Sequence, residues 1–167
     1  MSLDLIYVKE CLGQNRKPID IYKIRTMRED AEIDYRRIAY LNGLDSLGKI
    51  RDDPRLTNIG RFLRRYWIDE FPQIYNLAKG DIKLVGIRPM SEEDWTDYPV
   101  TIMKSSLRQK PGLVGINYAF APSDRFEDKF DHMHDYLEQW EIDPVGTDRR
   151  FLNDVIKNIV FRGIRSS

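Results

Sequence analysis

The stretch IDEFPQIYNLAKGDIKLVGIRP, residues 68–89, decides the fold, because helix and turn signals follow one another closely within it. A proline is tolerated in the first turn of a helix and disfavoured deeper, so Pro72 predicts a helix that begins close to Asp69 and Glu70. An apolar stripe at helical spacing follows, and Gly80 stands where such a helix would stop. The stretch therefore predicts a helix with two adjacent carboxylates at its start.

Short strands are expected on either side of this helix. Residues 81–86 contain Ile82, Leu84 and Val85 and end in the turn 86–89. Residues 18–27 alternate between two faces and are rich in β-branched and aromatic side chains. The other elements follow from helical periodicity, capping residues and breakers. Before the dyad these are a charged helix at 28–40, a loop at 42–54 and a helix at 55–66. After it come a helix start at Ser91, a helix at 100–109 and an irregular segment at 116–124. Two helices end the chain: the first has Phe126, Phe130, Met133, Leu137 and Trp140 on one stripe, and the second is capped by Thr147.

Composition fits one folded domain. The chain has 167 residues, 41% of them hydrophobic, which is enough for one domain with a sizeable core and too few for two. Lys and Arg number 27, as do Asp and Glu, so the net charge favours no class of partner. The single cysteine, Cys11, excludes a disulfide framework and a cysteine-rich zinc site. We predict a predominantly helical α/β fold, a small single domain over residues 1–167 with a minimal β-sheet or hairpin and amphipathic interfacial helices.

The first residues carry no targeting signal. No apolar run approaches the roughly 18 residues of a transmembrane helix, and residues 1–10 lack the apolar stretch of a signal peptide. The start Met1-Ser2-Leu3 is typical of a cloning scar. We therefore expect that a segment upstream of it was removed.

Asp69 and Glu70 are the first candidates for chemistry. Adjacent carboxylates in the first turn of a helix lie at the positive end of the helix dipole, which favours their ionised form. An ionised aspartate can act as a nucleophile or bind a divalent metal ion through oxygen. The alternative is that the pair only starts the helix, and the dipeptide alone does not decide between these interpretations.

Basic residues on both sides of the dyad suit an anion. Arg88 is presented from a turn at the end of a strand, a position that suits bidentate contact with phosphate. Lys23 and Arg25 project from one face of the first strand and could point together at an anion. The alternatives are a surface arginine in a turn and two solvated residues at a sheet edge.

A basic helix face precedes the dyad. Arg61, Arg64 and Arg65 gather next to Trp67, and basic residues beside aromatic ones suit a membrane surface. Nucleic acid and plain solvent are the other interpretations of such a face. The sequence alone leaves these three open.

The segment DHMHD, residues 131–135, offers another set of possible metal ligands. His132 and His134 are two positions apart, so on a helix they point about 200° away from each other. We therefore expect no metal site there.

The order of these signals along the chain resembles a known family. Four blocks carry the resemblance, in order and at suitable spacing. They are IYKIRTM (21–27), DPRLTNIGRFLR (53–64), IDEFPQIYN with KGD and VGIRP (68–76, 79–81 and 85–89), and KPGLVG (110–115). The chain is similar to the bacterial sugar transferases, the monotopic polyprenyl-phosphate phosphoglycosyl transferases, which include undecaprenyl-phosphate sugar-1-phosphate transferases.

The resemblance implies a reaction at the cytoplasmic face of the bacterial inner membrane. A UDP-sugar donates its sugar-1-phosphate to a polyprenol phosphate and UMP is released, which initiates the synthesis of a glycoconjugate such as an exopolysaccharide. By this resemblance Asp69 is the nucleophile that forms a phosphosugar intermediate. Glu70 would hold Mg²⁺ together with Asp69.

The same resemblance suggests which residues contact the donor and the membrane. Arg88 and Pro89 would lie at the nucleotide or its phosphates. The other expected phosphate-binding residues are basic, namely Lys23, Arg25, Lys110 and Arg125. The membrane would meet the basic helix face and its neighbouring tryptophan.

The sequence departs from the family pattern in three places. The N-terminal membrane segment of the family, which dips in and returns, is absent, and we attribute this to truncation. The Trp-Gln and Gly-Arg pairs expected after Gly115 are missing, with Arg125 as a candidate replacement, and Met133 stands where relatives carry an acidic residue. A catalytically silent relative that binds a nucleotide sugar is therefore the alternative to an active transferase, whereas zero net charge argues against nucleic acid.

Overall fold

The structure is a computed structural model that describes residues 5–28, 31, 33–43, 50–121, 125 and 127–161. The helices in these residues are α1 (Tyr35–Asn42), α2 (Asn58–Arg65), α3 (Gln73–Lys79), α4 (Val100–Ser106), α5 (Asp128–Ile142) and α6 (Pro144–Phe161). The strands are β1 (Ile6–Leu12), β2 (Pro18–Ile24), β3 (Lys83–Gly86) and β4 (Gly112–Gly115). The predicted fold class, α/β and predominantly helical, is confirmed. The proposed cloning scar at residues 1–3, Phe126 and part of the predicted irregular segment lie outside the described residues.

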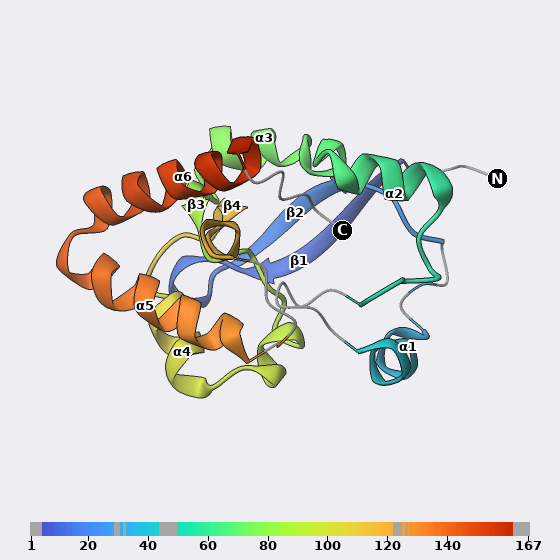
Figure 1. The fold of residues 1–167 in the computed structure, drawn as a ribbon, viewed down its shortest axis with the longest axis horizontal. Helices are drawn as coiled ribbons and strands as arrows, with labels where there is room; N and C mark the ends of the chain where they lie inside the picture. The colour runs from blue at the N-terminus through green and yellow to red at the C-terminus, as the bar shows by residue number, and fades with distance from the viewer. Residues whose placement is uncertain are drawn as a thin grey trace.

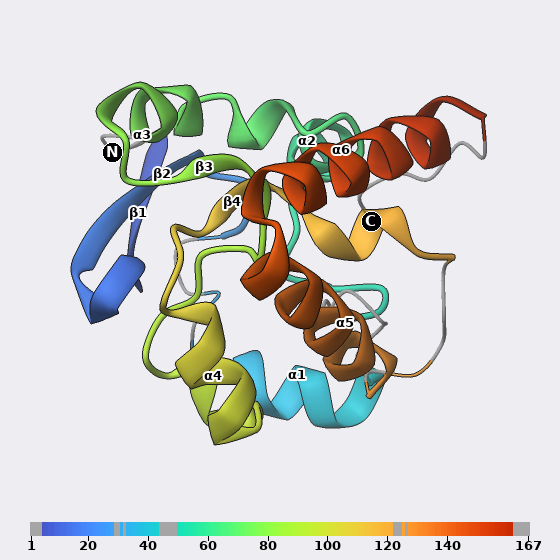
Figure 2. The same cartoon turned by 90° about the vertical axis from the view of Figure 1, so that its left-hand side faces the viewer.

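The strands lie between two groups of helices (Figure 1). In this view and in the view turned by 90° (Figure 2), α2, α3 and α6 run along the upper side of the molecule. α1, α4 and α5 lie on the lower side in both views. The strands therefore separate an upper and a lower layer of helices.

β1 and β2 form an antiparallel hairpin. The strand predicted at 18–27 is confirmed over Pro18–Ile24, and β1 is its partner along its whole length. Ile21 is buried on the inner face of the hairpin. α3 is fastened to β2, because the side-chain amide of Asn76 donates a hydrogen bond to the carbonyl of Asp20 at 2.6 Å.

β3 and β4 form a second, parallel pair. The strand predicted at 81–86 is confirmed over Lys83–Gly86, whereas β4 was not predicted from its glycine-rich sequence. Parallel pairing needs a crossover connection, and the segment that contains α4 provides it. A Cβ atom at Gly112 would lie 2.1 Å from the backbone nitrogen of Gly86, so only glycine allows this close approach.

The main core lies where α5 and α6 meet the β3–β4 pair. Met133, Tyr136 and Phe151 are almost fully buried there. The rings of Tyr136 and Phe151 meet edge to face, with their centroids 4.9 Å apart. The apolar stripe predicted for the first of the two C-terminal helices is therefore the buried face of α5.

Two predicted helix starts are wrong. α6 begins at Pro144 and not at Thr147. Asp143 provides the cap, because its carboxylate accepts a hydrogen bond from the backbone nitrogen of Gly146 at 3.0 Å. α1 begins at Tyr35, within the charged segment 28–40 and not at its start.

α2 and α3 turn their apolar stripes outward. Phe62, Ile74 and Tyr75 are exposed on these two helices. The inward face of α2 instead presents Gly60, where a Cβ atom would lie 2.0 Å from the carbonyl oxygen of Thr26. Within the described residues, no helix combines the length and the apolar character needed to cross a membrane.

Candidate active site

A cavity of about 320 Å³ lies beside the strands and receives side chains from both helix layers. Its wall includes residues of β2 and α2, of the turn after α2, and of the loops that follow β3 and β4. Lys23, Asp69, Glu70 and Arg88 all lie on this wall. The structure thus brings the predicted dyad together with two of the predicted phosphate-binding residues.

Asp69 is carried into the cavity by a short 3₁₀ turn, Ile68–Glu70, between α2 and α3. Trp67 separates this turn from α2, because its backbone is left-handed with a φ of 56°. α3 begins only at Gln73, so the dyad lies just before the helix and not in its first turn. Asp69 is 6% exposed in this position.

The surroundings of Asp69 differ from those expected at a helix start. Burial raises the pKa of Asp69, and the charge of Glu70 raises it further. The positive charges of Lys23, Arg64 and Arg88 oppose this rise. The expectation that a helix start favours the ionised form does not hold for Asp69, because the dyad precedes α3 and burial raises the pKa of Asp69. A carboxylate with a raised pKa is a stronger base, and hence a stronger nucleophile once it is ionised.

Glu70 is held by Arg88 in a bidentate ion pair. One guanidinium nitrogen of Arg88 donates to Oε2 of Glu70 at 3.1 Å, and the other donates to Oε1. Burial would lower the pKa of Arg88, but the charge of Glu70 raises it above its ordinary value. The pair therefore keeps both of its charges within the cavity wall.

Lys23 adds a second cation near the end of β2. Burial lowers the pKa of Lys23 to about 8, and the neighbouring charge of Arg88 adds to this effect. The carboxylates of Glu70 and Asp69 oppose it. The ammonium group is therefore charged at neutral pH, but its charged form is less strongly favoured than that of a surface lysine.

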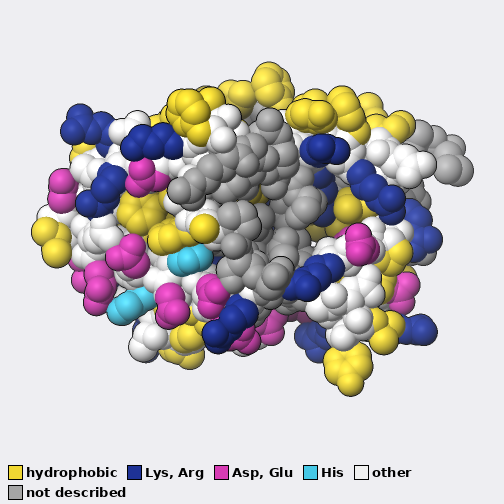
Figure 3. Space-filling view, viewed as in Figure 1, with side chains coloured by type: hydrophobic (Ala, Val, Ile, Leu, Met, Phe, Trp, Pro, Cys, Tyr) yellow, Lys and Arg dark blue, Asp and Glu magenta, His cyan; other side chains and the backbone are white. Residues whose placement is uncertain are grey.

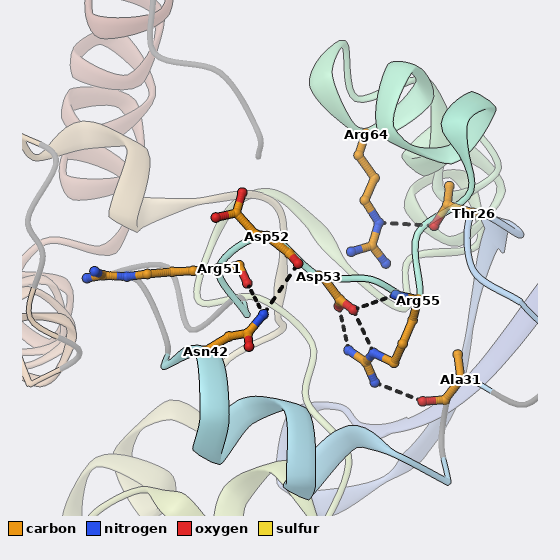
Figure 4. A network of polar contacts seen from close by, with 8 residues as sticks. All are labelled: Thr26, Ala31, Asn42, Arg51, Asp52, Asp53, Arg55 and Arg64. Carbon is orange, nitrogen blue, oxygen red and sulfur yellow. Dashed lines mark hydrogen bonds and ion pairs between the residues drawn. The ribbon is translucent and has the colours of Figure 1, made fainter.

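Arg64 is the third cation. It was predicted to lie on the membrane surface, yet it lines the cavity and donates from Nε to Oγ1 of Thr26 at 3.0 Å (Figure 4). Its direction follows from Gly60, which lies one turn earlier on α2 and presses against the same segment. An inward glycine four positions before a basic residue was the signal that sequence reasoning missed.

A second carboxylate–guanidinium pair braces the wall (Figure 4). Arg55 donates from Nε and Nη2 to the two carboxylate oxygens of Asp53, at 2.8 and 2.6 Å. It also donates from Nη1 to the carbonyl oxygen of Ala31 at 2.9 Å. Burial would raise the pKa of Asp53, but hydrogen bonds from Arg55 hold it below its ordinary value. Both carboxylate oxygens of this pair are already engaged, so it acts as structure and not as a ligand site.

Three predicted phosphate-binding residues lie away from this centre. The guanidinium carbon of Arg25 lies 5.6 Å from the ring centroid of Tyr7, beyond the end of β2. Lys110 lines a separate and much smaller pocket. Arg125 is exposed, and its Nε lies 3.8 Å from the carboxylate of Asp128.

The remaining predicted residues divide between the cavity and the surface. Pro89 lines the cavity beside its arginine neighbour. Arg61 and Arg65 are exposed on α2. Trp67 packs edge to face against Tyr118, with ring centroids 5.7 Å apart.

Several wall residues were not predicted. Asn117 and Tyr118 come from the turn after β4, Tyr35 from α1, Lys129 from α5, and Tyr98 from the segment before α4. No motif or periodicity marks them, because each belongs to a different element. The departure from the family pattern after β4 was the one signal that pointed toward this wall.

The described residues contain no group of three His, Cys, Asp or Glu side chains that could hold a metal ion. Mg²⁺ commonly needs only one or two carboxylates, with substrate phosphates and water as its other ligands. Asp69 and Glu70 fit this requirement as a pair of oxygen donors beside a cavity. His132 does not join them, because its ring stacks on Phe120 with centroids 3.7 Å apart.

Comparison with known proteins shows the family of the chain. The family model described as bacterial sugar transferase matches residues 2–162. The chain is 41% identical over 112 residues to the galactosyl transferase CpsE of Streptococcus agalactiae, covering 66% of this chain and 25% of that protein. It is 31% identical over 116 residues to the undecaprenyl-phosphate galactose phosphotransferase of Salmonella typhimurium, covering 66% of this chain and 24% of that protein.

A shorter relative matches over more of its own length. The exopolysaccharide production protein ExoY of Sinorhizobium fredii is 31% identical over 117 residues, covering 67% of this chain and 51% of that protein. The chain thus spans between about a quarter and about half of the length of these relatives. Because the family model covers nearly the whole chain, the chain belongs to the bacterial sugar transferase family.

Proposed function

We propose that this protein transfers sugar-1-phosphate from a UDP-sugar to a polyprenol phosphate and so initiates the synthesis of a surface glycan. The observation that carries the proposal is a buried aspartate, Asp69, beside the cationic side chains of Lys23, Arg64 and Arg88 on the wall of one cavity. The names of two relatives, galactosyl transferase and undecaprenyl-phosphate galactose phosphotransferase, support the choice of reaction.

In the first half-reaction, the carboxylate of Asp69 attacks the phosphorus atom that bears the sugar. A bond forms between the carboxylate oxygen and phosphorus, and the bond from phosphorus to the bridging oxygen breaks. UMP leaves with the electron pair of that bond. The sugar phosphate remains on Asp69 as an acyl phosphate.

In the second half-reaction, a phosphate oxygen of the polyprenol phosphate attacks the same phosphorus atom. The bond from phosphorus to Asp69 breaks and returns the carboxylate. The product is a polyprenol diphosphate sugar. Because UMP leaves before the lipid acts, the two substrates need not be bound at the same time.

The surrounding cations would make the attack possible. The donor diphosphate is anionic and would repel a carboxylate in a buried site. Lys23, Arg64 and Arg88 can offset this charge where it develops on the reacting phosphate. Arg88 would do so while holding Glu70 at a fixed position beside the nucleophile.

The proposed cofactor is Mg²⁺, held by Asp69 and Glu70 together with the donor phosphates. Bound there, it would offset phosphate charge as a Lewis acid. The chain's own residues limit how this can happen, since Glu70 is already paired with Arg88. The pair must share or release a carboxylate oxygen when the ion binds.

The outward faces of α2 and α3 are proposed to lie on the membrane surface. Figure 3 shows hydrophobic side chains gathered along the upper edge of the molecule, where these helices run. They share high exposure and include Ile59, Phe62, Tyr66, Ile68, Phe71, Ile74 and Tyr75. Arg61 and Arg65 are also exposed on α2, where they could meet anionic headgroups. The proposed location is the cytoplasmic face of the bacterial inner membrane.

The proposal is tested by UMP release. The chain is incubated with UDP-galactose, UDP-glucose and UDP-N-acetylgalactosamine in turn, with Mg²⁺ and a polyprenol phosphate in detergent. We expect UMP release with one or more donors and none from Asp69→Asn. Without the lipid, wild-type protein should gain the mass of one sugar phosphate. If no donor yields UMP although a UDP-sugar binds, the chain is the catalytically silent relative and the proposal is wrong.

A further inference from the structure

The cavity has two chemically different ends. The cationic end consists of Lys23, Arg64 and Arg88 around Asp69. The other end, called here the tyrosine end, consists of wall residues from α1, from α5 and from the 3₁₀ turn Asp94–Asp97 with the residue after it. Its members are Tyr35, Asp94, Asp97, Tyr98 and Lys129.

The two ends lie on opposite sides of the strands. α2 and the turn that carries Asp69 belong to the upper layer in Figure 1, whereas α1 and α5 belong to the lower layer. The cationic end is therefore nearer to the outward faces of α2 and α3. The tyrosine end points away from that surface.

The aromatic side chains of the tyrosine end are fixed in place. The ring of Tyr98 meets Trp95 and Phe130 edge to face, with centroid distances of 5.3 and 5.4 Å. The guanidinium carbon of Arg55 lies 5.2 Å from the ring centroid of Tyr35. Both rings are thus held by neighbours and need little ordering when a ligand binds.

The charged side chains of this end are also positioned. Oδ2 of Asp94 accepts hydrogen bonds from the ammonium group of Lys9 at 2.6 Å and from the backbone nitrogen of Ser91 at 2.8 Å. Among the described residues, Oδ1 of Asp94 accepts no hydrogen bond and can accept one from a ligand. The ammonium group of Lys129 lies 4.8 Å from the ring centroid of Tyr98, in a residue that is 9% exposed.

We propose that the tyrosine end binds the sugar ring of the donor, and that Asp97 and Lys129 select among sugars. This proposal rests on the proposed function. Two carboxylates repel a diphosphate, so the phosphates belong at the cationic end. A pyranose presents hydroxyl groups that donate and accept, and the carboxylates, ammonium group and phenols of this end match both roles. Uracil matches less well, because its carbonyl oxygens would face carboxylate oxygens.

The order of the reaction favours the same assignment. UMP leaves after the first half-reaction, and the lipid phosphate must then reach the sugar-bearing phosphorus atom. A sugar at the tyrosine end stays clear of this route, because the lipid arrives from the side of α2 and α3. The sugar can therefore remain bound in one place while UMP leaves and the polyprenol phosphate takes its place on the other side of the phosphorus atom.

Binding measurements test the proposal independently of turnover. Dissociation constants are measured by calorimetry with Mg²⁺ for UDP alone and for the three UDP-sugars named above, in protein that carries Asp69→Asn so that no donor is turned over. The contribution of the sugar is the ratio of the Kd of UDP to the Kd of the UDP-sugar. We expect Lys129→Met and Asp97→Asn each to lower this ratio about tenfold for the preferred sugar, because each removes a hydrogen bond to a charged group. The Kd of UDP itself should change less than about threefold.

A matched variant and a second position keep the outcome decisive. Lys157→Met removes an exposed lysine of α6 and should leave both constants unchanged. Asp97 lies in an exposed turn, so its variant tests the proposal even if Lys129→Met does not fold. An equal loss of affinity for UDP would assign this end to the nucleoside and overturn the proposal. The proposal would also be overturned if neither variant changed the ratio. The same holds if Asp69→Asn protein without a further change bound no UDP-sugar more tightly than UDP.

The same set of experiments separates this proposal from the proposed function. If the variants lower the ratio but wild-type protein releases no UMP, the sugar site stands and the transfer reaction is wrong. If UMP is released but the ratio is unaffected, the reaction stands and the sugar site is wrong.

Discussion

Helices α5 and α6 bury the apolar residues that form the core, whereas α2 and α3 expose their apolar stripes. On α6 the buried apolar residues are Phe151 and Val155, while Ile156 and Val160 are exposed. Met133 of α5 and Val155 of α6 are each 1% exposed. In α3, Gln73 and Asn76 are the fully buried side chains, while Tyr75 is 60% exposed. The amphipathic pattern is similar in both pairs of helices, but its direction relative to the core is reversed.

The reversal indicates two different tasks. α5 and α6 supply core, in the ordinary way of a globular domain. α2 and α3 supply little core and instead carry Arg64 and the turn with Asp69 on one side and an apolar surface on the other. If the outer surface lies on a membrane as proposed, this helix layer places the charged residues a single helix diameter, about 10 Å, from the lipid. We can test the contrast with separate substitutions on the inner side of the α2–α3 layer, in the core formed by α5 and α6, and on the outer side of the α2–α3 layer.

The largest effect is expected on the inner side, at the nucleophile. Asp69→Asn should lower the rate of UMP release at least about a thousandfold, because the amide cannot form the covalent intermediate. It should not destabilise the fold, since burial already disfavours the charged form of Asp69. UMP release and urea unfolding check both statements. Asp131→Asn, an exposed change on α5, is the control, and residual activity of Asp69→Asn within tenfold of wild type would contradict the assignment.

The core should respond in stability. Phe151 is 5% exposed and packs against Tyr136, so Phe151→Ala should lower the free energy of unfolding by about 3–5 kcal/mol. Phe71 is 70% exposed, so Phe71→Ala should change it by less than about 0.5 kcal/mol. Urea denaturation of the two variants measures the difference. Similar losses of unfolding free energy in the two variants would mean that Phe71 contributes to the core as Phe151 does.

The outer surface should respond in membrane binding. Phe71→Ser combined with Tyr75→Ser should weaken binding to vesicles that contain anionic lipid by about tenfold or more, because each aromatic ring loses apolar burial in the interface. Sedimentation with vesicles measures the partition. The matched control is Ile142→Ser combined with Val145→Ser, which changes two equally exposed apolar residues at the junction of α5 and α6. Equal effects of the two double variants would remove the distinction between the helix pairs.

The smallest effect is the dependence on pH. Asp69 must be ionised to attack, and its pKa is raised, so kcat/KM should fall as pH decreases from a point above the ordinary aspartate range. Lys23 must be protonated to hold phosphate, and its pKa is about 8, so kcat/KM should fall again as pH rises through that value. UMP release measured between about pH 5 and 10 should therefore give a bell-shaped profile.

Lys23→Arg identifies the alkaline limb. A guanidinium group stays charged over this range, so the fall near pH 8 should disappear or move upward in the variant. An unchanged alkaline limb would show that another group titrates there.

Local signals predicted much of the fold. Pro72 and Gly80 bracket α3, and the alternation at 18–27 marks β2. β4 was not predicted because its glycines are explained only by contacts made across a crossover: Gly112 lies against the backbone of Gly86, and Gly115 against the side chain of Arg88. A sequence pattern within one segment carries no information about a contact with a segment that is distant in the chain.

The site was predictable where the family blocks lie and not elsewhere. Glu70 and Arg88, which form an ion pair in the structure, were both chosen from their blocks. Arg64 was assigned to the wrong side of α2, because an apolar stripe ordinarily marks the inner face. Lys129 and Tyr98 carry no local signature, since their place on the wall depends on packing of α5 against the segment before α4.

The parallel pairing of β3 with β4 has a consequence for how the enzyme is made. The β1–β2 hairpin joins neighbours in the chain and can form within microseconds, whereas the β3–β4 pair must close a long connection first. During synthesis the ribosome releases every charged residue of the cationic end before it reaches Gly112. A nascent chain thus holds Asp69 and the three cations for some time without β4, whose Gly115 lies against the side chain of Arg88. The proposed transfer should then begin only when β4 joins its partner.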